Sequence, residues 1–468
     1  MITPDAAYWS TVQQARAIKE GKFSSRELLE LLVERESLIN ENLNAVVTLD
    51  LDRARLAADA ADEALAAGRS YGPLHGIPVT IKDALETKGL RSTGGATELS
   101  DYIPNRDAPV VDAIKRAGAI VFGKTNLPRW SGDIQSYNEI FGTTVNPWNS
   151  ERVPGGSSGG AAAAVSAGLT SFEIGTDIGG SIRFPASFCG IYGHKPSFGI
   201  VPSTGYLDHR HGGMTEADVN VIGPLARSAD DLELLTTLML RQEGPLVAAL
   251  PPAPRDITNL KVAVWLEDSF CPLDAKVSAV LENAIENFAA TGVSIDRTAR
   301  PEIEAEEAFR IGSWLVTSAM LQSMPEQTLE ALGENGAAPE ASHRQWLDND
   351  LQRRKICLKW SEFFSEYDAI VMPISPVPPF PHDQQGNFGN RNLLSSDGTT
   401  RPYADLVRWT ILTGMAYLPS TTAPVGLDED GLPVSFQVVG PYGSDYMTIR
   451  LAEFIAQHNL GYQHPPVE

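Results

Sequence analysis

The stretch "VPGGSSGGAAAA", Val153 to Ala164, surrounds two serines with four glycines and continues directly into alanines. A flexible linker would lead to a domain boundary, but strongly patterned apolar sequence lies on both sides of this one. A phosphate-binding turn would need the Gly-Lys-Ser/Thr ending of a P-loop or the Gly-x-Gly-x-x-Gly spacing of a dinucleotide site, and the stretch has neither. The question is therefore what two serine hydroxyls do on so flexible a turn.

The composition is that of a globular protein with an acidic surface. Over 468 residues, 37 Lys and Arg stand against 59 Asp and Glu, which gives a formal net charge of -22. Such a charge repels nucleic acid and anionic membrane surfaces, so we expect neither as a partner. Cys189, Cys271 and Cys357 are far apart and have no metal-ligand spacing, which favours a reducing compartment. Without a leader pattern or an apolar run of membrane-spanning length, the sequence predicts a cytoplasmic location.

Helical and strand patterns alternate along the chain and are joined by short loops. A capping box formed by Ser24 and Glu27 predicts a helix that starts there, and "HGIPVTIKD", residues 75–83, alternates as a strand does. We also expect helices over 51–67, 161–169, 229–240 and 445–457, and strands over 119–123, 171–177, 259–268, 293–297, 367–374 and 432–440. The segment 178–187 has no regular period, and the proline-rich 373–382 and Gly/Asn-rich 384–392 are expected at the surface. The pattern predicts one large α/β domain with a mixed sheet covered by helices on both faces.

Lys82 ends the strand of residues 75–83 and follows alternating apolar residues. A lysine held there away from water would have a lowered pKa and could act as a base. The ordinary alternative is a surface lysine whose stem lies along the apolar strand end while its ammonium reaches water.

Ser181 follows Gly179 and Gly180 in "GTDIGGS". Because glycines lack side chains, successive backbone N–H groups can converge beside the serine hydroxyl, as an oxyanion hole requires. The alternative is a serine that caps a helix in a glycine-rich turn. For each residue alone, the structural alternative stays open. A catalytic role becomes the favoured interpretation because one chain contains Lys82, Ser181 and the twin serines together.

The chain resembles the amidase signature family. Its segments "GGSSGG", "GTDIGGSIRFPASFCGIYGHKPS" and "GPLHGIPVTIKD" match the segments that define the family, and "LPSTTAPVGLDEDGLPVSFQVVGP" resembles its C-terminal stretch. The resemblance covers most of the chain and is most specific between about Gly72 and Gly199. It implies a single amidase domain over residues 1–468, with the signature core at about 72–199 and a variable, helical substrate-binding region at about 300–400.

The resemblance also implies a catalytic triad with Ser181 as nucleophile, Ser157 as a second serine held by a cis peptide bond, and Lys82 as base. Glycines on both sides of Ser157 give its backbone the freedom for that peptide. Neutral Lys82 would take the proton of Ser157, which would take that of Ser181. Backbone N–H groups of Ile178, Gly179, Gly180 and Ser181 itself would form the oxyanion hole.

Four neighbouring side chains are expected to hold the loops by hydrogen bonds rather than to react: Ser158, Thr176, Asp177 and Arg183. His75 and His194 lie near the motifs, and packing or a local hydrogen bond is expected for both. His209 and His211 have no carboxylate or cysteine at ligand spacing. The sequence therefore predicts neither a metal nor a cofactor.

We expect hydrolysis of a carbon–nitrogen acyl bond in a small amide, ester or carbamate, by a monomer or homodimer. Two alternatives stay open: the catalytic subunit of a tRNA-dependent amidotransferase, and a non-catalytic binding protein on the same scaffold. The variable helical region and loops over Tyr206–Met214, Ile311–Met324 and Pro373–Asn392 are expected to form the substrate pockets. An apolar acyl group, as in aryl amides or carbamates of aryl amines, is suggested by Trp314, Leu315, Met320 and Phe380.

Overall fold

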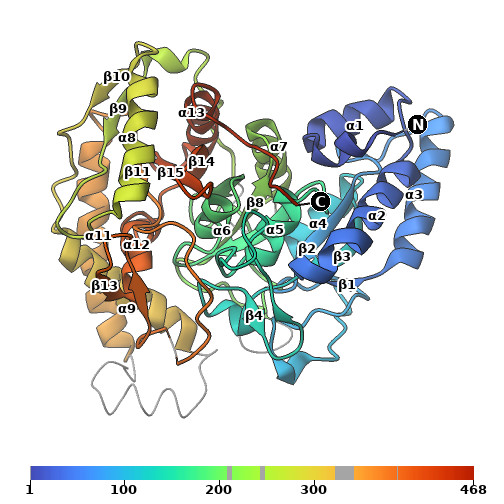
Figure 1. Ribbon diagram of the computed structural model, residues 1–468, viewed down its shortest axis with the longest axis horizontal. Coiled ribbons are helices and arrows are strands. Elements are labelled where there is room, and N and C mark those ends of the chain that lie inside the picture. The colour runs from blue at the N-terminus through green and yellow to red at the C-terminus, as the bar shows by residue number, and fades with distance from the viewer. Residues whose placement is uncertain (1, 208–212, 243–247, 322–341, 387, 468) are drawn as a thin grey trace.

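A large mixed β-sheet with helices on both sides forms the centre of the computed structural model (Figure 1), which describes residues 2–207, 213–242, 248–321, 342–386 and 388–467. The predicted fold class is confirmed. In spatial order the eight strands are β10 (Ser294–Asp296), β9 (Lys261–Val264), β11 (Ala369–Pro373), β15 (Pro433–Val439), β14 (Ser420–Leu427), β7 (Tyr192–Lys195), β8 (Val221–Ala226) and β6 (Glu173–Asp177). β9 is parallel to both of its neighbours, and the remaining neighbouring pairs are antiparallel.

A second sheet carries Lys82. It has the strand order β1 (Val46–Leu49), β3 (Ile120–Thr125) and β2 (Pro78–Lys82), so that β2 is an edge strand. β2 runs parallel to β3, and its free edge lies beside β6 of the large sheet. Two short hairpins complete the strands: β4 (Tyr137–Asn138) with β5 (Gly142–Thr143), and β12 (Asn392–Leu394) with β13 (Thr400–Pro402).

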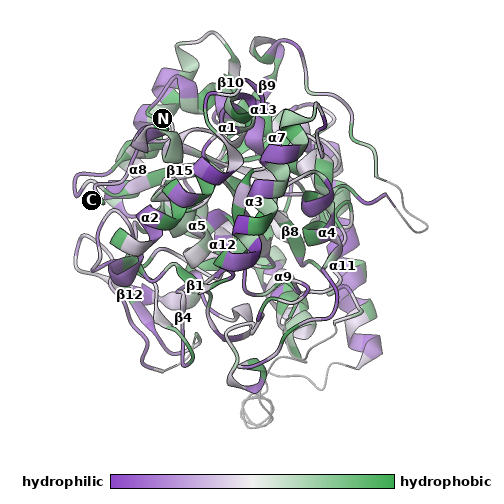
Figure 2. Cartoon of the chain, turned by 90° about the vertical axis from the view of Figure 1, so that its right-hand side faces the viewer, coloured by the Kyte–Doolittle hydropathy of each residue, from purple (hydrophilic) through white to green (hydrophobic). Residues whose placement is uncertain are grey.

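Most of the helices are amphipathic and bury one face, whereas the two that follow the serine-containing turns are buried throughout. The predicted capping box is present, since Ser24 accepts from the Glu27 amide and Glu27 accepts from the Ser24 amide. In Figure 2 hydrophilic residues mark the outer side of α3, whose buried face is a row of alanines. The α-helices are α1 (Thr11–Lys19), α2 (Ser25–Leu43), α3 (Leu51–Ala66), α4 (Pro109–Arg116), α5 (Gly159–Ser166), α6 (Arg183–Phe188), α7 (Ala229–Met239), α8 (Ala275–Ala289), α9 (Ala305–Met320), α11 (His343–Phe363), α12 (Arg408–Gly414) and α13 (Asp445–Gln457).

Alternate residues of the large sheet contribute to different hydrophobic cores. On β9, Val262 and Val264 pack in the core that contains α8 and α13 residues, whereas Ala263 packs in the core of α9, α11 and α12. Because side chains alternate across a strand, these cores lie on opposite faces of the sheet. Helices α8 and α13 therefore cover one face of this part of the sheet, and helices α9, α11 and α12 cover the other.

The glycine-rich turn is packed so tightly that side chains are excluded. A Cβ on Gly156 would lie 2.6 Å from the backbone oxygen of Asp133, and one on Gly160 would lie 2.5 Å from the backbone of Asn126. All residues of α5 are buried, and the peptide bond between Gly156 and Ser157 is cis. The glycines before the alanine run therefore allow two loops to approach the start of a fully buried helix.

Two sequence-based expectations were wrong. Within the segment 178–187, which was expected to be irregular, α6 begins at Arg183 and is fully buried. Pro373–Phe380, expected at the surface, is almost wholly buried, because neighbouring loops bond its backbone and Phe380 packs edge-on to Phe188. Proline and glycine composition indicates a loop but carries no information about which loops the rest of the fold covers.

In the described part of the chain, no helix is long and apolar enough to cross a membrane.

Candidate active site

Lys82 is buried at the end of β2, in contact with three hydroxyl groups. Its side chain is 0% exposed, which excludes the surface alternative. The Nζ atom lies 2.7 Å from the Ser157 Oγ, 3.0 Å from the Ser158 Oγ and 2.7 Å from the Thr176 Oγ1. The structure thus brings the predicted base together with the first of the twin serines.

Loss of hydration changes the protonation of Lys82. Burial lowers the pKa of its ammonium group to about 7, although the negative charges of Asp177 and Glu173 act in the opposite direction. A group with this pKa is present as free amine in a large fraction of molecules near neutral pH. The neutral amine can accept a proton from a hydroxyl that contacts it.

The loop of Ser157 is held by a residue that the sequence analysis missed. The Ser136 hydroxyl donates to the carbonyl oxygens of Gly155, at 3.1 Å, and Ser157, at 3.4 Å, and it accepts from the Gly159 amide at 3.0 Å. These bonds hold the backbone on both sides of the cis peptide. Ser136 belongs to no recognised motif, and only its position in the fold reveals the role.

Asp177 organises the turn that carries Ser181. Its carboxylate accepts from the amides of Gly180 at 2.8 Å and Ile182 at 3.2 Å, and it pairs bidentately with Arg183 at 3.0 and 2.9 Å. Burial opposes ionisation, but the Arg183 guanidinium outweighs it and holds the pKa of Asp177 below its usual value. The N-cap of α6 is Ile182, without a side-chain cap bond, so Ser181 does not serve as a helix cap.

Elements from the C-terminal region fix this turn from the other side. Arg183 donates to the Thr410 carbonyl at 2.9 Å and to the Gln437 Oε1 at 3.0 Å, and the Thr410 hydroxyl donates to the Gly179 carbonyl at 2.7 Å. Ser181 is 5% exposed, and its carbonyl accepts from the Ser158 amide at 3.2 Å. The two serine loops are therefore joined directly. The four residues for which supporting roles are expected all form hydrogen bonds in these loops: Ser158, Thr176, Asp177 and Arg183.

The two histidines near the motifs have local partners. His75 lies 3.1 Å from the Ala61 carbonyl, and His194 lies 3.1 Å from the Asp445 carboxylate and 2.8 Å from the Thr421 hydroxyl. Among the residues that the structure describes, no three His, Cys, Asp or Glu side chains form a group that could hold a metal ion. His209 and His211 lie outside the described residues.

The residues expected to line the substrate pockets divide into two groups. Leu315 and Phe380 belong to hydrophobic cores, whereas Trp314 and Met320 are only partly buried. The expected pocket segments Tyr206–Met214, Ile311–Met324 and Pro373–Asn392 each include residues outside the described ranges, namely 208–212, 322–324 and 387. The described part of the second segment lies mostly in α9.

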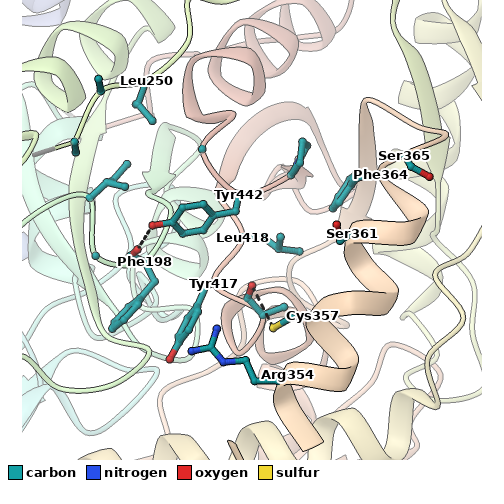
Figure 3. A pocket seen from close by; sticks show the side chains of 17 residues that line it. Phe198, Leu250, Arg354, Cys357, Ser361, Phe364, Ser365, Tyr417, Leu418 and Tyr442 are labelled. Atoms are coloured by element: carbon teal, nitrogen blue, oxygen red, sulfur yellow. Dashed lines mark hydrogen bonds between the residues drawn. The ribbon is translucent and has the colours of Figure 1, made fainter. Parts of the chain in front are cut away.

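A cavity of about 1030 Å³ lies between α11 and the loops around Tyr417 and Tyr442 (Figure 3). In Figure 3 the side chains of Arg354 and Cys357 face it from α11 and that of Phe364 from directly after this helix, opposite Phe198 and the two tyrosines. None of the three predicted triad residues is part of the lining.

A buried lysine against a serine hydroxyl, in a fold whose large mixed sheet is covered by helices, is the combination that the amidase signature resemblance implies for an amide-hydrolysing α/β enzyme. The chain belongs to the amidase family, whose model, described as Amidase, matches residues 27–449.

The relatives include hydrolases and components of amidotransferases. The chain is 31% identical to an indoleacetamide hydrolase of Bradyrhizobium diazoefficiens, over 93% of this chain and 84% of that protein. It is 30% identical to a glutamyl-tRNA(Gln) amidotransferase subunit of Acinetobacter baumannii, over 95% and 94% of the two chains. The solved structure of the corresponding subunit from Thermotoga maritima superposes with a TM-score of 0.82 at 25% identity and covers 100% of both chains.

Replacing Arg183 by Leu is expected to destabilise the protein strongly, because it leaves the buried Asp177 carboxylate without its counter-charge. Breaking a buried ion pair in this way costs about 3–5 kcal/mol of unfolding free energy. Equilibrium denaturation in urea measures the change. Arg16→Leu is the control, since that arginine pairs with Glu20 at the surface and its side chain is 77% exposed, so it should change stability little. Equal effects of the two variants would contradict the role assigned to the buried pair.

Proposed function

We propose that the protein is a serine amidase that cleaves a carbon–nitrogen acyl bond through an acyl-enzyme on Ser181. The observation that carries the proposal is the 2.7 Å contact between the buried Lys82 Nζ and the Ser157 Oγ. The hydrogen bond between the Ser158 amide and the Ser181 carbonyl supports it, because it joins the two serine loops directly.

In the proposed reaction, neutral Lys82 takes the hydroxyl proton of Ser157 while Ser157 takes that of Ser181. The Ser181 oxygen attacks the substrate carbonyl and forms a tetrahedral oxyanion. As the carbon–nitrogen bond breaks, the relay runs in reverse and Ser157 protonates the departing amine. Water then attacks the acyl-enzyme, giving its proton to the same relay, and releases the acid and free Ser181.

Backbone amides would stabilise the oxyanion, and the geometry refines which of them do so. The Gly180 N–H is directed at Asp177. We therefore assign the oxyanion hole mainly to the amides of Ile178, Gly179 and Ser181 and give Gly180 the task of shaping the turn. Donors fixed in advance in a site with little water are the main source of such stabilisation.

Aryl amides are the substrate class that we propose, with carbamates of aryl amines and activated esters as secondary substrates. The relative named as an indoleacetamide hydrolase supports an apolar, aromatic acyl group. Rates on a panel of chromogenic anilides, aliphatic amides, esters and carbamates test this class. The three free cysteines support a cytoplasmic enzyme, because unpaired cysteines are typical of a reducing compartment. We propose that it works without a cofactor, as a monomer or homodimer.

A second candidate function is that of an amidotransferase component, which the 30% identity over nearly the whole of that relative favours. Activity of the purified chain alone distinguishes the two. An amidase hydrolyses its substrates without a partner, whereas an amidotransferase component would need its partner chains for efficient release of ammonia from glutamine.

Replacing Ser181 by Ala should abolish formation of the acyl-enzyme and leave the fold intact, because removal of one hydroxyl from a turn changes little packing. Intact-mass analysis after treatment with a fluorophosphonate reports the covalent adduct. A label on another serine of the wild type, or undiminished turnover by the variant, would show that the nucleophile is wrongly assigned.

Ser157→Ala should damage amide hydrolysis more than ester hydrolysis. An amine must be protonated as it leaves, whereas a phenolate departs with little help. The ratio of kcat/KM for a matched amide and ester pair, compared between wild type and variant, measures this difference. Equal losses for the two substrates would mean that Ser157 only positions Ser181.

The activity should rise with pH through the pKa of Lys82, near 7, and level off above it, because only the free amine accepts a proton. Lys82→Ala should lose several orders of magnitude and flatten this limb. Lys82→Arg should not restore activity, since a guanidinium stays protonated. The measurement is kcat/KM from about pH 5 to 10, the range that brackets unperturbed histidine and lysine. If the limb persists in Lys82→Ala, another group is the base.

A further inference from the structure

Glu173 is a buried carboxyl group that belongs to none of the roles described so far. It begins β6, is 0% exposed, and receives four hydrogen bonds. The amides of Lys82 and Ile174 donate to its Oε2, both at 3.0 Å, and the hydroxyls of Thr80 and Thr125 donate to its Oε1 at 2.7 and 2.9 Å. Its partners thus come from β2, β3 and its own strand.

This carboxyl group provides the hydrogen-bond acceptor that a neighbouring strand would otherwise provide to β2. β2 is an edge strand whose other side pairs with β3, so the amides on its free edge need other acceptors. The Thr80 amide donates to the Thr170 hydroxyl at 2.9 Å, and the Lys82 amide donates to the Glu173 carboxyl group at 3.0 Å. Glu173 therefore fixes the backbone of the lysine relative to β6, and Thr176, three residues further along β6, contacts the same lysine's Nζ.

The hydrogen bonds favour the charged form of Glu173, whereas burial is the larger influence and raises the pKa of its carboxyl group to about 7. The carboxylate is therefore the main form above neutral pH. Both amides are obligatory donors, so the oxygen that they share carries no proton. The charged or titratable groups around it are Lys82 from β2, Lys124 from β3, Asp83 just after β2, and Asp177 with Arg183 at the far end of β6. A negative charge at Glu173 stabilises the ammonium form of Lys82 and opposes the effect of burial.

We propose that Glu173 is a positioning residue for Lys82: its carboxylate holds the lysine-bearing strand against β6, and its negative charge adds to the larger effect of Asp177 in moving upward the pH range in which Lys82 becomes a base. The inference rests on the proposed function, in which Lys82 is that base. The two effects can be separated, because a glutamine can keep the hydrogen bonds without the charge. Its carbonyl can accept from the two amides while its NH₂ group donates to the two threonine hydroxyls.

The test is the rate at which a fluorophosphonate labels Ser181 between about pH 5 and 10, a readout that does not depend on the natural substrate. For Glu173→Gln we expect a plateau rate of labelling close to that of the wild type. The rising part of the plot of rate against pH should move by about one unit to lower pH, so that labelling at a given pH in this part is about tenfold faster. Glu173→Ala removes the hydrogen bonds that hold β2 as well as the charge. It should lower the plateau rate of labelling about tenfold or more, the usual loss when a positioning contact is removed.

Asp231→Asn is the matched control. Asp231 is also buried and also accepts backbone amides, those of Thr11 and Val12, but it is not among the groups whose charge acts on Lys82. Its limb should coincide with that of the wild type. The proposal would be overturned if the rising part of the pH profile of Glu173→Gln coincides with that of the wild type or moves to higher pH. It would also be overturned if Asp231→Asn shows the same shift as Glu173→Gln.

Failure of this inference can be told from failure of the proposed function. If Lys82→Ala retains the rising limb, Lys82 is not the base and both proposals fall. If Lys82→Ala loses the limb while Glu173→Gln keeps the wild-type midpoint, only the role of Glu173 is refuted. If Glu173→Ala does not fold, the comparison of Glu173→Gln with Asp231→Asn still decides the question.

Discussion

The removal of Lys82 from water is the constraint on which the rest of the site depends. A buried ammonium group loses its hydration, so its proton is held less firmly and the hydrogen bonds that water would make must come from the protein. The hydroxyls of Ser157, Ser158 and Thr176 supply them. This shell makes the lysine available as a base near neutral pH and places it in contact with the serine that would relay the proton.

The close packing around that lysine explains the glycines of the turn. Ser157 can reach Lys82 only if its loop lies against the backbone of residues 133–135, and at this distance a Cβ on Gly156 would collide with main-chain atoms. Ser136 then fixes the loop through three hydrogen bonds. Flexible residues are used here to build a rigid site, because the absence of side chains permits contacts that afterwards allow little movement.

The buried pair of Asp177 and Arg183 joins the site to the C-terminal third of the chain. Asp177 shapes the turn of Ser181 through backbone amides, and Arg183 carries the connection to α12 and β15 through Thr410 and Gln437. Residues more than 200 positions apart in the sequence thus fix one turn.

The sequence by itself determined the alternation of helices and strands, the Ser24 capping box, the strand that ends on Lys82 and the motifs of the amidase family, because these depend on local periodicity and on short segments. It could not decide whether Lys82 is exposed, whether Pro373–Phe380 lies at the surface, or that Ser136, Thr410 and Glu173 brace the site. Burial and hydrogen-bond partners are set by segments distant in the chain, and neither composition nor spacing records them. Only the tertiary structure brings the free edge of β2 against β6, and that contact turns an ordinary strand-end lysine into a candidate base.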